Sequence, residues 1–403
     1  MRERWREVRL GDLLTLVRRR AVIDPTETYK LVTLPINGVG ARLRKEVSGG
    51  ELGTAKYLVR HGDLMISKID ARKGSNSLLP GELDGAIVTG DFLSYEVDNS
   101  LISSEMLDIF VKRREFSELC DTVSSGTTNR VRLDPRRFLE LAIKLPPLAE
   151  QRRIVDLIGA VDDAIEAAEG EATATEAMAR SARKQLLHPD VAWENVTIGD
   201  VSRVVTGRSF KAEHQGCTSG VIPYFRVSDM TATGNERELL RPNDWLDEAG
   251  VAAVKPVVCP PGTVVFPILG AALATEKRRV LGVSAGFVQH MIGLVPGPQV
   301  LSGILLAVMQ DVRLADFSQH GAMPSVNQKL VSGITFSLPP LDAQEQIVEQ
   351  LGAIEAAADA ARTHAESLRT LRSNLLTVLL SGEHEIPATY DDLLSNEDVS
   401  TAA

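Results

Sequence analysis

One phrase and one residue pattern occur twice in this chain, 193 positions apart, and this repeat constrains the fold more than any other feature. Leu145-Pro146-Pro147-Leu148 opens the first copy, and Leu338-Pro339-Pro340-Leu341 opens the second. Each phrase precedes a long, proline-free, alanine-rich segment in which mainly small or apolar residues are spaced alternately by four and three. The first copy has Ile154, Ile158, Val161, Ile165, Ala168, Ala172, Thr175, Ala179, Ala182 and Leu186; the second has Ile347, Leu351, Ile354, Ala358, Ala361, Ala365, Leu368, Arg372, Leu375 and Leu379. This heptad spacing predicts two long helices that pair with each other as an antiparallel coiled coil.

A fainter repeat precedes each predicted helix. Trp5 and the Leu10-Gly11-Asp12 phrase align with Trp193 and the Ile198-Gly199-Asp200 phrase at an offset of 188. We therefore predict five segments: a globular domain at 1–145, a spacer helix at 146–188, a second domain at 189–337, a second spacer helix at 338–382 and an acidic, disordered tail at 383–403.

The secondary-structure signals within each domain are similar. Short runs of β-forming residues come first, separated by turn residues, and one helix follows late, at 104–119 in the first domain and at about 300–312 in the second. Strands without regular alternation with helices predict an α+β fold. Because the fold is expected twice, we predict an internal pseudo-two-fold repeat.

The charge distribution is more informative than the net charge of −10. The first 145 residues carry 24 lysines and arginines against 21 acidic residues, whereas residues 338–403 carry 3 against 12. An acidic total therefore does not exclude nucleic acid, because phosphate binding needs only a local basic surface. Cys120, Cys217 and Cys259 have no metal-ligand spacing, so we expect reduced thiols and no metal site in a cytoplasmic protein.

Sequence motifs for catalysis are scarce. The chain contains no Gly-x-x-x-x-Gly-Lys-Ser/Thr phosphate loop, no His-Glu-x-x-His and no Asn-Pro-Pro-Tyr. We therefore expect a non-catalytic protein that binds no cofactor itself.

The phrase that opens the first helix, Leu145-Pro-Pro-Leu-Ala-Glu150-Gln151, resembles the conserved region that follows each target-recognition domain in specificity subunits of type I restriction–modification systems. The second copy matches with Ala343 in place of Glu150, and Ile222-Pro-Tyr-Phe-Arg-Val227 and Asn327-Gln328 fit further phrases of that family. The residues aligned with the Asn-Gln pair in the first domain are Asp134-Pro135, which departs from the pattern.

The resemblance implies a phage-defence function. Each domain would read one half of a bipartite, asymmetric site in double-stranded DNA, and the helices would set the spacer between the halves. The helix starts would dock modification (methyltransferase) subunits, two of them by the repeat, through Pro146, Pro147, Glu150, Gln151, Pro339, Pro340 and Gln344. Restriction (endonuclease and translocase) subunits would join for cleavage, with S-adenosylmethionine and ATP bound to these partners. The alternative is a protein-interaction scaffold of the same fold that does not read DNA, which the acidic C-terminal segment favours.

The candidate DNA contacts are basic and polar residues in turn-rich segments, because arginine grips guanine edges and lysine meets phosphate. In the first domain they are Lys68, Arg72, Lys73, Ser125, Thr127, Asn129, Arg130 and Arg132. In the second they are Arg208, Lys211, Arg226, Lys277, Arg278 and Arg279.

Overall fold

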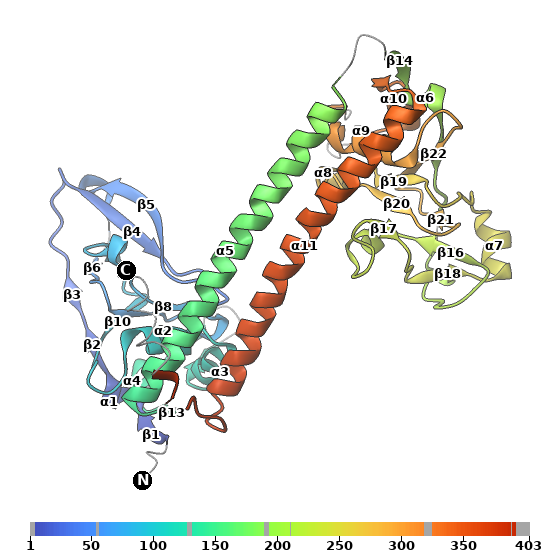
Figure 1. Cartoon of the computed structure of the whole chain (residues 1–403). Coiled ribbons are helices and arrows are strands. Elements are labelled where there is room, and N and C mark those ends of the chain that lie inside the picture. The colour runs from blue at the N-terminus through green and yellow to red at the C-terminus, as the bar shows by residue number, and fades with distance from the viewer. Residues whose placement is uncertain are drawn as a thin grey trace, which may run out of the picture. The chain divides into compact units, whose positions relative to one another are not determined.

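The computed structural model describes residues 5–53, 56–126, 131–188, 193–209, 211–317, 325–387 and 389–391. The chain forms two compact units (Figure 1). Unit 1 comprises Met1–Ala167 and Glu366–Ala403, and unit 2 comprises Ala168–Ala365.

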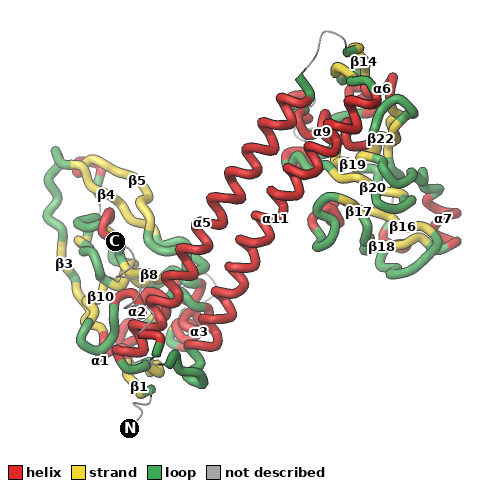
Figure 2. The backbone as a smooth tube through the Cα atoms, in the orientation of Figure 1, coloured by secondary structure: helices red, strands yellow, loops and turns green. Residues whose placement is uncertain are grey.

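Unit 1 is built from a central sheet, a second larger sheet, smaller strand pairs and short helices (Figure 2). The central sheet has the antiparallel order β2 (Leu14–Val17), β10 (Phe92–Val97), β7 (Leu64–Ser67), β8 (Asn76–Leu78). The second sheet has the order β3 (Arg19–Arg20), β6 (Tyr57–Leu58), β9 (Ile87–Val88), β4 (Thr28–Thr33), β5 (Arg42–Ser48). The helices are α1 (Leu10–Leu13), α2 (Ser104–Val111), α3 (Arg114–Thr122) and α4 (Pro135–Leu139), with the 3-10 turns η1 (Gly49–Glu51), η2 (Ala71–Lys73) and η3 (Gly81–Leu83). Tyr95, Phe116 and Phe138 are fully buried and pack ring against ring in the core.

Unit 2 repeats this plan with different loops. Its central sheet has the order β15 (Ser202–Thr206), β22 (Met291–Pro296), β19 (Val264–Pro267), β20 (Arg279–Leu281), β17 (Glu238–Leu239). A smaller sheet has the order β18 (Asp244–Leu246), β16 (Ile222–Phe225), β21 (Gly286–Phe287). The helices are α6 (Ile198–Val201), α7 (Glu248–Val254), α8 (Gly270–Ala274), α9 (Ser302–Asp311) and α10 (Gln328–Ser332), with 3-10 turns η4 (Ala212–His214), η5 (Val227–Thr231) and η6 (Leu314–Phe317). Strands with a late helix in both units confirm the predicted α+β fold, and α9 lies where the second helix was expected.

A two-stranded clasp closes each domain where it meets the long helices. In unit 1, β1 (Arg6–Arg9) pairs with β13 (Ala142–Leu145), and Arg6 lies opposite Leu145. In unit 2, β14 (Glu194–Thr197) pairs with β23 (Thr335–Leu338), and Glu194 lies opposite Leu338. The two registers coincide after the sequence offsets of 188 and 193 are applied, so the repeat read from the sequence is a repeat of backbone pairing.

The long helices are α5 (Leu148–Leu186) and α11 (Leu341–Leu379), each 39 residues long. In unit 1 the start of α5 lies beside the end of α11, where Asp162 pairs with Arg372. In unit 2 the end of α5 lies beside the start of α11, where Arg183 Nη2 is 3.2 Å from Glu355 Oε1. The helices are therefore antiparallel in each unit, as predicted. All twenty predicted seam residues are buried or half-buried and none is exposed, which confirms the heptad register.

Two local predictions are wrong. The helix expected over 104–119 is broken between α2 and α3, because the 37–40 loop packs against the break. A Cβ on Gly38 would lie 2.5 Å from the carbonyl oxygen of Lys112. The first part of the tail is ordered: Ile386 is buried in the core of unit 1, and Arg153 Nη2 lies 2.7 Å from Asp391 Oδ2. Residues 392–403 lie outside the described part of the chain.

Candidate nucleic-acid interface

Three segments of unit 1 meet at one end of the central sheet. Lys68 follows β7 directly, and its backbone N–H donates to the carbonyl oxygen of Asp91, the residue before β10, at 2.8 Å. The Lys68 carbonyl oxygen accepts from the N–H of Leu133 at 2.8 Å. Leu133 belongs to the hairpin of β11 (Ser124–Ser125) and β12 (Arg132–Leu133), in which Ser125 lies opposite Arg132. The backbone thus brings together Lys68 and the hairpin that carries Ser125 and Arg132, two groups of candidates that the sequence analysis selected.

The side chains at this sheet end form a basic cluster of Arg18, Lys68 and Arg132. Arg132 pairs with Asp91, and Lys68 Nζ donates to the carbonyl oxygen of Gly90 at 2.9 Å. The guanidinium of Arg18 lies 5.3 Å from the ring centre of Tyr57. Partial burial lowers the pKa of Lys68, and the positive charges of Arg18 and Arg132 lower it further. Because neighbouring positive charges favour a bound anion, this cluster suits a phosphate or a base edge.

The corresponding end of the central sheet in unit 2 has the same backbone bonds. Ile268, directly after β19, donates to the carbonyl oxygen of His290, directly before β22, at 3.0 Å. Its own carbonyl oxygen accepts from the N–H of Val326 at 3.0 Å. Ile268, His290 and Val326 therefore occupy the places of Lys68, Asp91 and Leu133.

A polar cavity of about 390 Å³ lies beside this end of unit 2. Arg208 and Lys211, both selected from the sequence, line it together with Gln289 and His214. The N–H of Gln289 donates to the carbonyl oxygen of Arg208 at 3.0 Å, which holds the two residues side by side. Lys68 and Arg132 in unit 1 and Arg208 and Lys211 in unit 2 thus lie at equivalent ends of a repeated sheet, a relationship that only the folded chain reveals.

The remaining candidates are scattered. Arg72 and Lys73 lie on η2 and line a different cavity, of about 340 Å³, where Lys73 Nζ is 3.0 Å from Asp70 Oδ1. Arg226 pairs with the buried Asp244 and holds a loop of unit 2. Thr127, Asn129 and Arg130 lie outside the described residues.

The Lys277–Arg279 run was expected to face DNA, but two of its side chains are used inside unit 2. Arg278 is 3% exposed, and its Nε donates to the carbonyl oxygen of Met309 at 3.1 Å. Arg279 Nε donates to the carbonyl oxygen of Asn235 at 2.9 Å, and burial lowers the pKa of this guanidinium. The prediction is wrong for Arg278, because a buried guanidinium cannot reach a groove. Lys277 is half-buried.

The residues predicted to dock partner subunits lie at the start of each long helix and are mostly buried. Gln151 and Gln344 are 1% and 0% exposed, and Pro146 and Pro339 are buried. Glu150 Oε2 accepts from Trp5 Nε1 at 3.2 Å, and burial raises the pKa of this carboxyl group. Pro147 is half-buried and Pro340 is exposed. The surface of these junctions also carries Leu148 and Leu341, which are 43% and 48% exposed at equivalent positions and which the sequence reading had not singled out.

A sequence match to a catalytic motif has no structural support. Gly282-Val-Ser284-Ala-Gly286 fits the Gly-x-Ser-x-Gly pattern, which in hydrolases places serine on a turn between a strand and a helix. Here the segment joins β20 to β21, so no helix follows the serine.

Membrane-spanning and metal-binding features are absent from the described residues. Across them, no helix combines the length and the apolar character that crossing a bilayer requires. Among the same residues, no three His, Cys, Asp or Glu side chains gather where they could hold a metal ion.

Comparison with known proteins identifies similar sequences. Residues 2–174 match the family model of the type I restriction modification DNA specificity domain. The chain is 25% identical to the type I restriction enzyme HindI specificity subunit of Haemophilus influenzae over 40% of this chain and 36% of that protein, about a third of the relative's length. It is 19% identical to the putative type I restriction enzyme MjaX specificity subunit of Methanocaldococcus jannaschii over 94% of both chains.

Two solved structures have a similar fold. A chain from a structural study of complex assembly and conformational transition in the type I R-M system superposes with a TM-score of 0.64 and 20% identity, covering 94% of this chain and 98% of that one. The S subunit of the type I restriction–modification system of M. genitalium superposes with a TM-score of 0.55 and 14% identity, covering 93% and 96%. At these identities the likeness concerns the fold alone.

Proposed function

We propose that this chain, whose residues 2–174 match the family model of the type I restriction modification DNA specificity domain, is the DNA-recognition subunit of a type I restriction–modification complex. Each domain reads one half of a bipartite site in double-stranded DNA. The long helices set the number of unread base pairs between the halves. The subunit is non-catalytic and acts in the cytoplasm in defence against phage.

The observation that carries this proposal is the equivalence of the two candidate surfaces. Lys68 and Arg132 in unit 1 and Arg208 and Lys211 in unit 2 lie at corresponding ends of the central sheets. Basic side chains neutralise phosphates, and arginine or glutamine beside them reads base edges in the major groove. Since the side chains at the two sheet ends differ, the two half-sites differ in sequence.

The helix junctions serve the partner subunits in this proposal. Leu148 and Leu341 expose apolar side chains at the same position of the repeat, which suits two copies of one modification subunit. S-adenosylmethionine and ATP then bind to the modification and restriction subunits. The buried members of the predicted docking set, Gln151 and Gln344, support these surfaces from inside the chain.

Exchange of the first domain tests the proposal. Replacing residues 1–145 by the corresponding segment of another specificity subunit is expected to change one half of the methylated motif and leave the other half and the spacer intact. Mapping methylated adenines in cells that carry each version gives the answer. A motif unchanged in both halves would refute DNA reading by unit 1.

A binding assay separates this proposal from a scaffold that does not read DNA. The assembled complex is expected to bind a duplex carrying the mapped motif, with affinity that falls steeply between low and moderate salt because bound phosphates release counterions. A scaffold would show no preference for the motif over a scrambled duplex at either salt concentration.

A further inference from the structure

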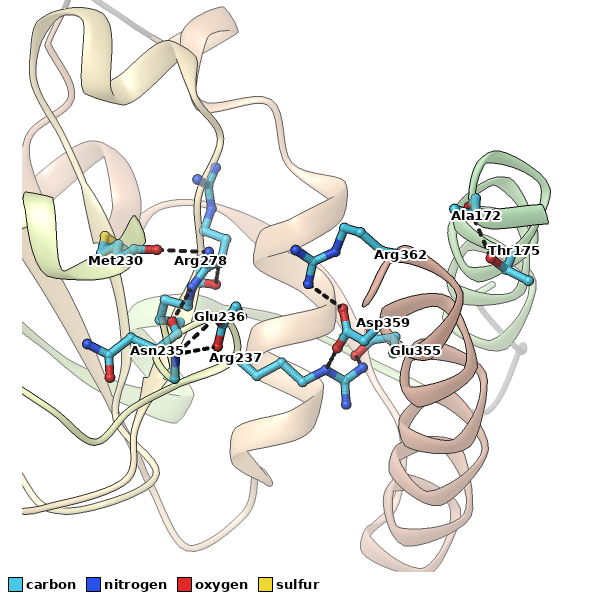
Figure 3. A network of polar contacts seen from close by, with 12 residues as sticks. Ala172, Thr175, Met230, Asn235, Glu236, Arg237, Arg278, Glu355, Asp359 and Arg362 are labelled. Atoms are coloured by element: carbon cyan, nitrogen blue, oxygen red, sulfur yellow. Dashed lines mark hydrogen bonds and ion pairs between the residues drawn. The ribbon is translucent and has the colours of Figure 1, made fainter. Parts of the chain in front are cut away.

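Arg237 connects the second domain to a long helix. It lies directly before β17, and its side chain extends to α11, as Figure 3 shows. Arg237 Nη2 lies 3.1 Å from Glu355 Oε2, and Arg237 Nε lies 2.5 Å from Asp359 Oδ2. One guanidinium thus donates to two carboxylates on successive turns of the helix, in charge-assisted hydrogen bonds that are stronger than bonds between neutral groups.

Two further arginines complete this network. The other oxygen of Glu355 accepts from Arg183 of α5 at 3.2 Å, and Asp359 Oδ1 accepts from Arg362 at 3.2 Å. The side chains of Arg183 and Glu355 are only 10% and 19% exposed, so solvent screens this pair less than a pair on the open surface. The network therefore ties three elements together: the β17 segment, α5 and α11.

The loop that presents Arg237 is held rigidly from within the domain. Asn235 is fully buried, and its side-chain oxygen accepts from the N–H groups of Leu240 and Arg241 at 3.0 Å each. Arg279 Nε donates to the carbonyl oxygen of Asn235 at 2.9 Å. Arg279, which the sequence analysis assigned to DNA, thus fixes the loop that carries Arg237 to the helix.

The ion pairs lie one to two turns further along α11 than the apolar attachment of the same domain. Ile347 and Leu351 of α11 are buried in the core of unit 2, and a Cβ on Gly303 of α9 would lie 2.7 Å from Val348. From Leu351 to Asp359 the helix rises about 12 Å. A cavity of about 500 Å³, lined by residues of α9, β20, α5 and α11, adjoins both regions. Apolar packing and the hydrogen bonds of Gln344 attach the domain near the start of α11, and the ion pairs of Arg237 add a contact further along the helix.

Unit 1 uses the same repeat position differently. Asp162 corresponds to Glu355 at the offset of 193, and it pairs with Arg372 of α11. Within the described part of unit 1, no basic side chain of the first domain forms an ion pair with Asp162. The domain-to-helix ion pair is thus a feature of the second domain.

We propose that Arg237 is a positioning residue that locks the second domain at one angle on α11 through Glu355 and Asp359. A fixed domain angle would restrict the spacer length and the orientation of the second half-site, and this consequence rests on the proposed function. The contact of Arg237 with α11 does not rest on it, so the contact and its consequence are tested separately.

The first experiment measures the lock in the full chain without DNA. In a Cys217→Ser background, spin labels at the exposed positions of Glu248→Cys and Ala353→Cys report the distance between the second domain and α11 by pulsed electron resonance. Arg237→Ala is expected to widen the distance distribution about twofold or more at moderate salt. About 1 M salt is expected to widen the parent distribution in the same way, because it shortens the screening length to about 3 Å. Arg241→Ala, which removes an exposed arginine further along the same segment, is the matched control and leaves the distribution narrow.

A double-mutant cycle shows whether the effect acts through the helix carboxylates. Glu355→Gln with Asp359→Asn is expected to widen the distribution as Arg237→Ala does, and the triple variant is expected to add nothing, because interacting residues are non-additive. Distributions unchanged by Arg237→Ala, or additive widening in the cycle, would overturn the proposal. A melting curve of each variant confirms that the domain stays folded, and Arg237→Lys is expected to restore part of the narrowing.

The second experiment uses the complete methyltransferase complex. Duplexes carry the mapped motif with the native spacer or a spacer one base pair longer or shorter, and methylation of each half-site is followed. The parent is expected to discriminate strongly among spacers, and Arg237→Ala is expected to bring the three duplexes within about threefold, the span of roughly 0.6 kcal/mol. Unchanged discrimination in Arg237→Ala would refute the positioning role. A parent complex that methylates no duplex would refute the proposed function and leave the distance measurement standing.

Discussion

Gln151 and Gln344 make the same three hydrogen bonds at the starts of α5 and α11. The side-chain oxygen of Gln151 accepts from the N–H of Ser103 at 2.9 Å, and that of Gln344 accepts from the N–H of Leu301 at 2.8 Å. Each side-chain nitrogen donates to two carbonyl oxygens, those of Leu101 and Pro146 for Gln151 and those of Gln299 and Pro339 for Gln344. Each glutamine thus fastens a long helix to the segment just before α2 or α9.

Removal of either glutamine side chain is expected to destabilise its unit. Gln151→Ala or Gln344→Ala leaves one N–H and two carbonyl groups of a largely buried junction without their partner, so we expect a loss of about 2–4 kcal/mol in the free energy of unfolding. Urea denaturation of the full chain measures it. Gln346→Ala, an exposed glutamine on the same helix, is the control and is expected to change stability by less than about 0.5 kcal/mol. Equal effects at Gln344 and Gln346 would contradict the junction role.

The basic cluster of unit 1 is expected to govern the salt dependence of DNA binding. Lys68→Ala and Arg132→Ala each remove one cation, so each is expected to weaken binding and to reduce the slope of log affinity against log salt by about one. Titrations of the assembled complex at three salt concentrations give the slopes. Arg114→Ala removes an arginine whose side chain is 89% exposed outside the cluster, and its slope is expected to match the parent. If both Lys68→Ala and Arg132→Ala kept the parental slope of log affinity against log salt, this surface would not contact DNA phosphates.

Arg278 is expected to affect stability and not DNA affinity. Arg278→Ala deprives the carbonyl oxygen of Met309 and the carboxylate of Glu276 of their donor inside unit 2, at a cost of about 2–4 kcal/mol. Thermal unfolding measures the loss, and the folded complex is expected to bind DNA as the parent does. Lys277→Ala, one residue away and half-buried, is the comparison. An Arg278→Ala complex with parental stability and weakened DNA binding would reverse this assignment.

The stability of unit 1 is expected to depend on pH through Glu150. Burial raises the pKa of Glu150 above its unfolded value, and its Oε1 has no hydrogen-bond partner among the described residues. The stability that the protonated form contributes is fully present below an unfolded pKa of about 4.3 and is lost as pH rises through the folded pKa. Glu150→Gln keeps an acceptor for Trp5 and cannot ionise. It is therefore expected to flatten the pH dependence of urea unfolding above about pH 4 and to stabilise the chain at neutral pH. A pH profile parallel to the parent would contradict this.

Helix length is expected to set the DNA spacer. One heptad inserted at facing positions of both α5 and α11 preserves the seam register and lengthens each helix by about 10 Å, equivalent to roughly three base pairs. The methylated motif of such a variant is expected to gain about three base pairs between its half-sites. An insertion in α5 alone misaligns the seam and is expected to destabilise the chain. If the variant with both helices lengthened kept the native spacer, helix length would not set the spacer.

The heptad seam followed directly from the sequence, because it depends on local periodicity and on a repeat that one chain displays twice. The clasps did not, because each pairs two strands that lie about 140 positions apart. The convergence of Lys68 and Arg132 did not, since 63 intervening residues separate them and only strand pairing brings them together. Arg278 shows the opposite error. Its run of three cations resembles a solvated basic patch, and nothing local indicates that Phe266 and the carbonyl oxygen of Met309 surround the middle residue.

The departure at Asp134-Pro135 is resolved by local geometry. Asp134 begins α4 with its side chain accepting from the N–H groups of Arg136 and Arg137, and Asn327 begins α10 by accepting from the N–H of Leu330. Aspartate and asparagine are both good helix caps, so the two residues serve one structural purpose. Arg237 lay beyond sequence reasoning altogether, because its partners on α11 are more than a hundred positions away.

The clasp in each unit has a consequence for how such chains diversify. Since β1 and β13 pair with each other, the chain enters and leaves the first domain through two adjacent, hydrogen-bonded strands. A genetic crossover outside both strands therefore exchanges a domain together with both of its paired terminal strands. A crossover between them would combine one strand with a partner from another domain. Recombination can in this way replace one domain while the two long helices stay unchanged.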